Sequence, residues 1–137
     1  MLRLFILLLG LSSLQAFAIP CQCEVMFFAP STASHKQKPT SFKNYDLEGF
    51  DSYKVKNQYA CRESCLKEFT TDMPTERVNA LLVQYSKAMI DERVLGYNCT
   101  GLSTYKYPVR VKASLGRLPL GNVADQIFVI NHEEVCF

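Results

Sequence analysis

The sequence has almost no excess of charge of either sign. Its 15 lysines and arginines nearly balance 13 aspartates and glutamates, so the formal net charge is +2 at pH 7. Binding to nucleic acid or to an anionic membrane surface depends on a clear basic excess, usually gathered in a patch. We therefore expect no nucleic-acid partner for this chain.

Residues that commonly carry catalysis are also scarce. The chain has only two histidines, His35 and His132, and neither stands in a nucleophile motif. No serine occupies a G-x-S-x-G elbow, the turn that exposes the nucleophile of α/β-hydrolases. We expect a protein that is not an enzyme and that has no catalytic residues.

Long apolar runs are missing outside the first 18 residues. There, the basic residue Arg3 precedes an apolar run from Leu4 to Leu14, and Ala16-Phe17-Ala18 supplies a small-x-small site. This order is typical of a secretory signal peptide that is cut after Ala18. The run is shorter than the roughly 20 residues that a helix needs to span a bilayer. The sequence therefore predicts a signal peptide over residues 1–18 and no membrane span.

The remaining residues, 19–137, have the length of one domain. The sequence ends without an apolar tail and without an endoplasmic-reticulum retention tetrapeptide. We therefore expect neither a glycosyl-phosphatidylinositol anchor nor retention. The predicted localisation of this single domain is secreted and extracellular.

Cysteine is what the chain does contain. All six cysteines follow the predicted signal peptide: Cys21, Cys23, Cys61, Cys65, Cys99 and Cys136. An even number of cysteines in an exported chain indicates three disulfides. We expect a domain that combines an apolar core with these cross-links.

The spacing of four cysteines indicates how they pair. Cys21 and Cys23 lie in an alternating segment, and residues two apart on a strand share one face roughly 6.5 to 7 Å apart. Cys61 and Cys65 lie in a segment of helical period, where residues four apart are stacked about 6 Å apart. The side chains within each pair do not converge. We expect the strand pair to cross to the helix pair, in either sense, and the two remaining cysteines to bond each other.

Strand-like alternation dominates the first part of the domain. It runs from Cys21 to Ala29 and returns over Phe50–Asn57, so both segments are predicted to be strands. The intervening Ser31–Asn44 is polar, contains Pro39 and shows no period of either kind. It is predicted to be an exposed loop.

Helical periodicity follows. A first amphipathic helix is predicted from Gln58 to Phe69, and a second after Pro74, with Asp72 accepting from its first amides. The second helix should end near Gly96. Its apolar stripe is predicted to face the core and consists of Val78, Leu81, Leu82, Tyr85, Ala88 and Met89.

The last part alternates again. Strict alternation over 105–115 places Tyr105 and Tyr107 on one buried face of a strand, and 116–122 should be a hairpin loop that returns through Ile127–Ile130. The order β, β, α, α, β, β predicts an α+β fold. We expect a mainly antiparallel sheet with two helices packed on one face, stapled by three disulfides.

Two further kinds of site can be considered. Asn98-Cys99-Thr100 is an N-x-S/T sequon, so Asn98 is a candidate glycosylation site and the protein a candidate glycoprotein. A zinc site built from four cysteines and His132 is not expected, because C-x-C with C-x-x-x-C is not the usual knuckle spacing and oxidation competes for the thiols. Oxidised cysteines also lack the thiolate needed for nucleophilic attack. We predict no metal and no cofactor.

Two local resemblances concern the cysteines. A C-x-x-x-C helix bridged to a C-x-C strand is similar to the cysteine-stabilised αβ motif of scorpion toxins and defensins, although there the helix precedes the strand. A C-x-C behind a signal peptide resembles the tissue inhibitors of metalloproteases. In those inhibitors the first cysteine is the mature N-terminus and chelates the protease zinc through its amine and carbonyl. The predicted cut leaves Ile19-Pro20 ahead of Cys21, which departs from that pattern.

A wider resemblance covers the whole chain. It rests on Cys21-Gln22-Cys23, Tyr59-Ala60-Cys61-Arg62-Glu63-Ser64-Cys65, Leu120-Gly121-Asn122-Val123-Ala124-Asp125 and Val135-Cys136-Phe137. These segments look like small secreted cysteine-containing proteins that occur in expanded families in nematodes and are functionally uncharacterised. The resemblance implies secretion and three disulfides, and it transfers no active-site residues.

These observations lead to three hypotheses of function. The leading one is a secreted, non-enzymatic interaction module that binds an unknown extracellular macromolecule or ligand. The alternative is an inhibitor of secreted hydrolases such as proteases, with the N-terminal segment or Ser31–Asn44 as its wedge. The third is a small secreted hydrolase, since acid/base pairs converge in space rather than in sequence.

Overall fold

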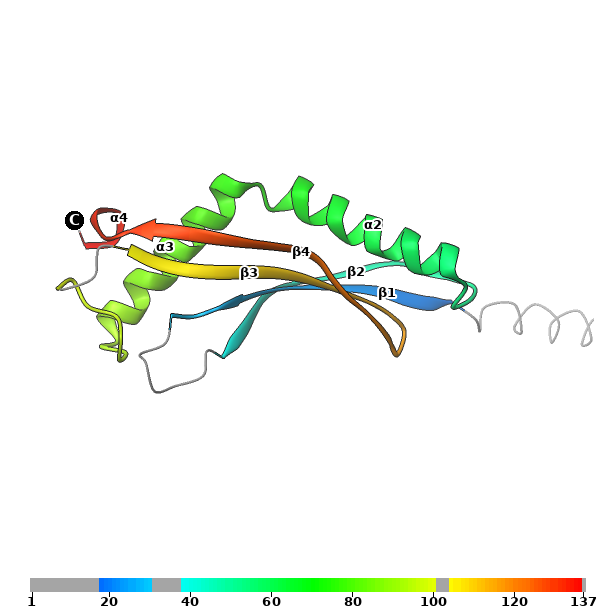
Figure 1. Cartoon of the computed structure of the whole chain (residues 1–137), viewed down its shortest axis with the longest axis horizontal. Coiled ribbons are helices and arrows are strands. Elements are labelled where there is room, and N and C mark those ends of the chain that lie inside the picture. The colour runs from blue at the N-terminus through cyan, green and yellow to red at the C-terminus, as the bar shows by residue number, and fades with distance from the viewer. Residues whose placement is uncertain (1–17, 31–37, 101–103, 137) are drawn as a thin grey trace, which may run out of the picture.

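The computed structural model of the chain describes residues 18–30, 38–100 and 104–136. Four strands form one antiparallel sheet in the order β2-β1-β3-β4. The strands are β1 (Ile19–Phe28), β2 (Pro39–Phe50), β3 (Thr104–Leu115) and β4 (Leu118–Asn131). The helices of the described residues are α2 (Val55–Asp72), α3 (Thr75–Asp91) and the short α4 (His132–Cys136), and Figure 1 shows α2 lying along the sheet.

The two central strands carry most of the core. In β1 the cysteines, Val25 and Phe27 are buried, and in β3 every second residue from Tyr105 to Leu115 is buried. The alternation predicted for β3 is therefore confirmed, as is the placement of Tyr105 and Tyr107 in the core. In β1 it holds except at Met26, which lies on the other face but is also buried, at 7% exposed. One face of the sheet is consequently dry.

Both long helices pack on this dry face. Two disulfides join α2 to β1. From α3, the ring of Tyr85 meets Phe27 of β1 edge-on with 4.7 Å between centroids, and the Ser86 hydroxyl lies 2.6 Å from that of Tyr107 in β3. The predicted α+β architecture, with two helices on one face of an antiparallel sheet, is confirmed. No described helix is long and apolar enough to cross a membrane.

The prediction of a loop over Ser31–Asn44 is wrong for its second half. Residues 39–44 belong to β2, which pairs antiparallel with β1, while residues 31–37 lie outside the described residues. β2 is an edge strand whose side chains are mostly exposed, and a register shift opposite Val25 and Met26 interrupts its alternation. Because an edge strand needs few apolar contacts, its polar composition does not reveal it.

The predicted strand over Phe50–Asn57 is also wrong. β2 ends at Phe50 and α2 already begins at Val55. The side-chain amide of Asn57, which is buried, lies 2.9 to 3.0 Å from acceptor oxygens of Asp51 and Ser52. These hydrogen bonds hold the connection in place, so the helix starts before its apolar period becomes visible.

Helix α3 departs from its prediction in three respects. It ends at Asp91, short of Gly96, and its N-cap residue Pro74 receives no side-chain capping hydrogen bond, so Asp72 does not cap it. Leu82 is 1% exposed as predicted, but Leu81 is 37% exposed and Ala88 is also exposed, so the assignment of these two residues to the core is wrong. Adjacent residues point about 100° apart on a helix, and only one of them can face the sheet squarely.

The connection between β3 and β4 is shorter than predicted. β4 begins at Leu118, so residues 116 and 117 alone make the turn. Gly116 has a φ of 57°, and a Cβ there would lie 2.6 Å from the Tyr53 hydroxyl and 2.7 Å from Ile19 Cγ2. A larger residue would be strained at this φ and would displace these side chains, so glycine is favoured at position 116. Two register shifts between β3 and β4 accommodate Pro119 and a further glycine inside a segment that resembled a loop.

Candidate binding surface on the open face of the sheet

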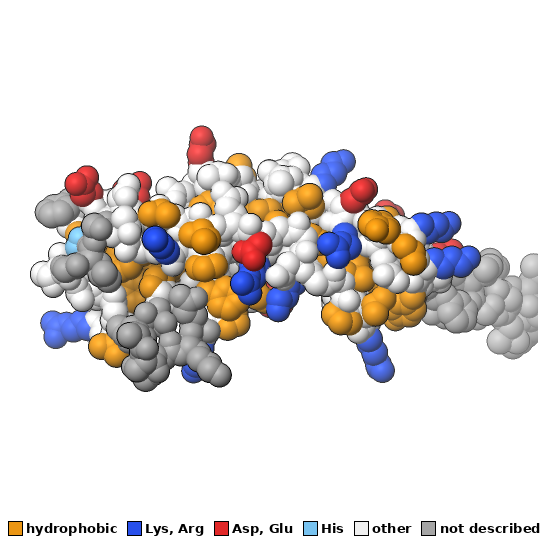
Figure 2. All heavy atoms as spheres, viewed as in Figure 1, with side chains coloured by type: hydrophobic (Ala, Val, Ile, Leu, Met, Phe, Trp, Pro, Cys, Tyr) orange, Lys and Arg blue, Asp and Glu red, His pale blue; other side chains and the backbone are white. Residues whose placement is uncertain are grey.

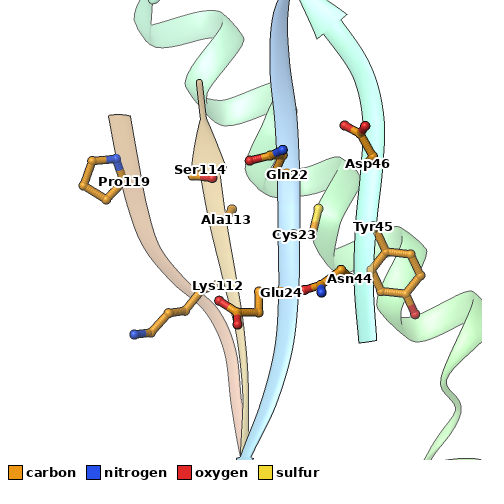
Figure 3. Close-up of a pocket in the computed structure, with 10 residues that line it drawn as sticks. All are labelled: Gln22, Cys23, Glu24, Asn44, Tyr45, Asp46, Lys112, Ala113, Ser114 and Pro119. Atoms are coloured by element: carbon orange, nitrogen blue, oxygen red, sulfur yellow. The ribbon is translucent and has the colours of Figure 1, made fainter. Parts of the chain in front are cut away.

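The face of the sheet opposite α2 and α3 is hollowed. The hollow has a volume of about 490 Å³ and reaches across all four strands, and Figure 3 shows it with a helix passing behind the strands. Its lining residues are Gln22, Cys23, Glu24, Asn44, Tyr45, Asp46, Lys112, Ala113, Ser114 and Pro119. We call this surface the open-face hollow.

Strand register arranges the polar side chains of the hollow in two rows. In one row Gln22 is paired with Asp46 of β2 and with Ser114 of β3, and Ser114 is in turn paired with Pro119. Directly opposed residues of an antiparallel sheet project from the same face, about 4.5 to 5.5 Å apart. The row therefore forms a polar line across β2, β1 and β3, which Pro119 ends at β4.

The second row is centred on Glu24. This residue is paired with Asn44 of β2 and with Lys112 of β3. Figure 3 shows these three side chains along the lower part of the hollow and Asp46 at its β2 side. The Asp46 carboxylate thus lies at the β2 side and the Lys112 ammonium at the β3 side, with the Glu24 carboxylate between them, so the hollow has an electrostatic polarity across the strands.

Within the described residues, the charged groups of the hollow have no side-chain partner in the fold. Among the described residues, no side-chain hydrogen bond or ion pair involves the carboxylate of Glu24, the carboxylate of Asp46 or the amine of Lys112. Asn44 accepts a hydrogen bond from Ser41 at 3.3 Å. The surface can therefore offer carboxylate, amide, hydroxyl and ammonium groups together to a polar partner.

Sequence reasoning missed this surface for a specific reason. The alternation in β1 and β3 does place Gln22, Glu24, Lys112 and Ser114 opposite the core, which indicates only a solvated face. The β2 members of the rows were hidden because Asn44 fell in the predicted loop and Asp46 in a stretch for which no strand was predicted. Only the pairing of β2 with β1 makes one hollow from three separate segments.

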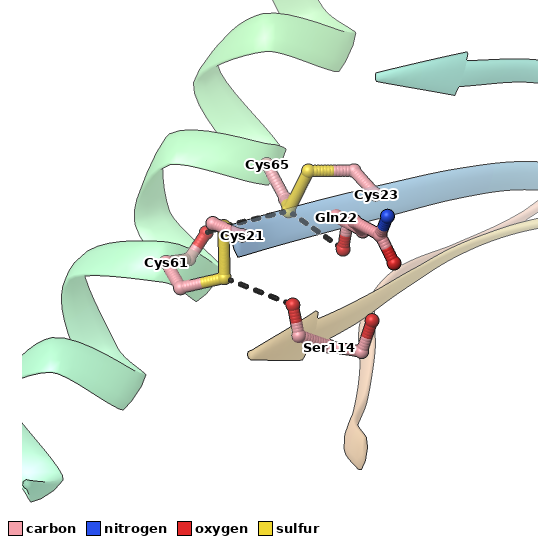
Figure 4. Close-up of a disulfide and its surroundings, with 6 residues drawn as sticks. All are labelled: Cys21, Gln22, Cys23, Cys61, Cys65 and Ser114. Atoms are coloured by element: carbon pink, nitrogen blue, oxygen red, sulfur yellow. Dashed lines mark hydrogen bonds between the residues drawn. A yellow bond between two sulfur atoms is a disulfide. The ribbon is translucent and has the colours of Figure 1, made fainter. Parts of the chain in front are cut away.

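The three predicted disulfides are present. Cys21 bonds Cys61 and Cys23 bonds Cys65, each with 5.6 Å between Cα atoms, and Figure 4 shows them side by side. The third bond joins Cys99 to Cys136 with 5.8 Å between Cα atoms. The cross-pairing of strand with helix is confirmed, and the described residues contain no free cysteine.

Topology explains the sense of the cross-pairing. β2 runs antiparallel to β1 and ends at Phe50, which is paired with Ile19 at the start of β1. The chain then turns into α2, which runs in the direction of β1. The first cysteine of the strand therefore meets the first cysteine of the helix.

The predicted glycosylation site lies on the surface. The side chain of Asn98 is exposed, and its oxygen accepts hydrogen bonds from the Thr100 amide at 3.0 Å and the Thr100 hydroxyl at 3.2 Å. This is a turn closed by the asparagine side chain. Its neighbour Cys99 is exposed as well.

The two histidines fall in different places. His35 lies outside the described residues. His132 is the first residue of α4 and stands beside the Cys99–Cys136 disulfide, so the structure does not bring it to the four cysteines that join β1 and α2.

The tyrosines near the sequon belong to the core. Tyr97 is 6% exposed, and its hydroxyl lies 3.3 Å from that of Tyr107, which in turn lies 2.6 Å from the Ser86 hydroxyl. Burial, the largest cause, raises the pKa of both Tyr97 and Tyr107 above the usual value. These hydroxyls are neutral members of a buried hydrogen-bonded chain and not a binding patch.

Comparisons of the chain with protein-family models, with curated proteins and with solved structures gave no match. The resemblance to small secreted proteins of nematodes therefore stays a prediction. The argument for function rests on the geometry of the surface itself.

Proposed function

We propose that the chain is a secreted, non-enzymatic interaction module that binds an extracellular macromolecule or ligand through the open-face hollow. The observation that carries the proposal is a concave surface, lined by polar side chains, whose charged groups make no described contact within the fold. Its volume falls in the range of about 300 to 1,000 Å³ that ligand sites occupy. Its lining includes carboxylate, amide, hydroxyl and ammonium groups, which favours a partner rich in hydrogen-bonding groups.

The frame behind the hollow supports this function. Cys23 lies directly beneath the hollow and is bonded to α2, and the neighbouring Cys21 is bonded one helical turn away. A surface that is already rigid loses little conformational entropy on binding. The sheet therefore presents its rows in a fixed spacing.

The polarity of the hollow indicates what the partner presents. Asp46 favours a basic group at the β2 side, Glu24 favours one at the centre of the hollow, and Lys112 favours an acidic group at the β3 side. Such complementarity governs specificity and the rate of association more than total affinity. We expect a partner that carries both signs of charge.

A matched pair of charge reversals tests the proposal. Asp46→Lys reverses a carboxylate in the hollow, whereas Glu63→Lys reverses an exposed carboxylate on α2, on the other side of the sheet. A partner would be isolated by co-purification with the tagged secreted protein from its native fluid, and its affinity for each variant measured. We expect Asp46→Lys to weaken binding at least about ten-fold, because like-charge contacts cost several kcal/mol. Equal affinity of both variants would show that the partner binds elsewhere.

The proposal includes export and modification. Three disulfides fit an oxidising compartment, and the exposed sequon supports a glycan on Asn98. The sequon is not among the residues that line the hollow, so a glycan there is compatible with binding.

A further inference from the structure

The Cys99–Cys136 disulfide differs from the other two in exposure. Cys21, Cys61 and Cys65 are 0% exposed and Cys23 is 2% exposed, whereas Cys99 is exposed and Cys136 is partly so. Attack by a thiol requires access to a sulfur atom. Only this one of the three bonds offers such access in the folded protein.

A histidine completes a cluster at the exposed bond. One ligand atom each from Cys99, His132 and Cys136 all lie within 4.8 Å of one another. His132 and Cys136 are four residues apart in α4, so their side chains share one face of that helix. The sulfur of Cys99 is brought to the same place by the disulfide.

The imidazole of His132 is held in position by its surroundings. Its Nε2 lies 2.9 Å from the carbonyl oxygen of Asn98, and its ring contacts Tyr105 edge-on with 6.0 Å between centroids. A carbonyl only accepts hydrogen bonds, so Nε2 carries a hydrogen, and in the neutral ring Nδ1 carries the lone pair. Metal-binding histidines are typically oriented in this way, through a hydrogen bond from the second ring nitrogen.

We propose that Cys99, Cys136 and His132 form a metal site that opens by thiol–disulfide exchange. A small-molecule thiolate attacks Sγ of Cys99, a mixed disulfide forms there, and Cys136 leaves as a thiolate. A second thiolate attacks the outer sulfur of the mixed disulfide, which releases the oxidised small molecule and the Cys99 thiolate. Two electrons pass from the two small thiols to the protein disulfide, and the thiol protons are released to solvent.

The opened site has the donor set of a soft divalent cation. Two thiolates and one imidazole suit Zn²⁺, which binds sulfur at about 2.3 Å and nitrogen at about 2.0 to 2.1 Å. Three protein ligands leave a fourth position for water or another ligand. The cluster of Cys21, Cys61 and Cys65 has no histidine, is buried and stays oxidised.

The first test is graded reduction of the folded, secreted protein. Samples treated with increasing concentrations of a small thiol are alkylated and mapped by mass spectrometry. We expect Cys99 and Cys136 to be labelled first, with the four buried cysteines still bonded. Labelling of the buried cysteines at the same thiol concentration would overturn the proposal.

The second test is metal binding by the partly reduced protein. Co²⁺ serves as the probe, because sulfur-to-cobalt charge transfer and visible d–d bands report tetrahedral thiolate coordination, and Zn²⁺ should then displace it. We expect both sets of bands after reduction and neither in the oxidised protein. Reduction without these bands would overturn the site.

A matched pair of variants tests the role of His132. His132→Ala should weaken Co²⁺ binding at least about ten-fold, the lower end of what even outer-sphere changes cost. Glu133→Gln alters the next residue of α4, which is exposed and outside the cluster, and should leave the affinity unchanged. An equal loss in both variants would show a general effect of α4 and remove His132 from the proposed ligands.

Discussion

At the scale of single residues, Leu81 and Leu82 show how burial separates chemically identical neighbours. Leu82 is 1% exposed and belongs to the core, whereas Leu81 is 37% exposed on the outer side of α3. We expect Leu82→Ala to lower the free energy of unfolding by about 2 to 5 kcal/mol, because it leaves a cavity. That is a large share of a total of about 5 to 15 kcal/mol.

Leu81→Ala is the matched control. The same atoms are removed from a largely solvated position, so the loss should be well below that of Leu82→Ala. Thermal or denaturant unfolding of both variants measures the difference. Equal losses would mean that α3 packs through a different stripe.

Asp72 connects β2 with the junction of α2 and α3. Its carboxylate accepts a hydrogen bond from the Tyr45 hydroxyl at 2.9 Å and lies 3.3 Å from Arg77 and 3.5 Å from Lys43. The Tyr45 hydrogen bond, followed by the neighbouring cations, lowers the pKa of Asp72 below its usual value. Burial and the bond to Asp72 raise the pKa of Tyr45, so the donor stays neutral.

These contacts predict a pH dependence of stability. Because the pKa of Asp72 is lower in the folded protein, its ionised form stabilises the fold above the unfolded pKa of about 3.9, and this is lost as pH falls toward the folded pKa. Asp72→Asn should therefore lower the urea midpoint at about pH 7, and the difference from the unchanged protein should shrink below about pH 4. Asp46→Asn, at an exposed carboxylate without a described contact, is the control and should leave the urea midpoint at about pH 7 unchanged.

At the scale of elements, the two disulfides between β1 and α2 act on nearly the same loop. Cys21–Cys61 spans 40 residues and Cys23–Cys65 spans 42. Either bond alone restricts the unfolded chain by about 4 kcal/mol in the loop-closure model. Once one bond is present, the other closes only the short ring made by 21–23 and 61–65. The second bond therefore adds much less stabilisation than the first.

This redundancy predicts non-additive losses. Replacing either pair of cysteines by alanine should cost less than about 4 kcal/mol, and replacing both pairs should cost more than the sum of the two separate losses. Denaturant unfolding of the three variants measures the coupling. Replacement of Cys99 and Cys136 by alanine is the control, because their bond closes a separate loop. The loss of unfolding free energy that it causes should add to the loss from either β1–α2 pair. Additive losses for the two β1–α2 pairs would contradict the shared-loop argument.

At the scale of the whole molecule, export and processing can be checked on secreted material. Cleavage after Ala18 predicts a mature chain that begins at Ile19. Sequencing of the secreted N-terminus measures this, and a chain beginning at Cys21 would instead support the metalloprotease-inhibitor hypothesis. The structure places Cys21 inside β1, fully buried and bonded to Cys61.

The same material tests the glycan. Glycosidase treatment should reduce the apparent mass of the secreted protein, and Asn98→Gln should abolish that shift. Thr100→Ala removes the sequon but keeps the asparagine, so it should give the same result. A shift that persists in both variants would place the modification elsewhere.

The predictability of each part depended on how many of its sides are buried. β1 and β3 have one dry face and one open face, so their apolar alternation was enough to identify them. β2 lies at the edge with only Tyr45 buried, and α2 begins through hydrogen bonds of Asn57, which no apolar period records. The open-face hollow combines three segments, one of which was hidden in this way.

The sequence by itself determined the elements with a long apolar period, β1, α3 and β3, and the set of three disulfides, because both follow from spacings of only a few residues. Tertiary structure decided the sense of the Cys21 and Cys23 bonds, the polar rows of the hollow and the meeting of His132 with Cys99. Each of these depends on how segments far apart in the chain pair or pack. Their contacts are set by the topology of the sheet, and local spacing does not encode that topology.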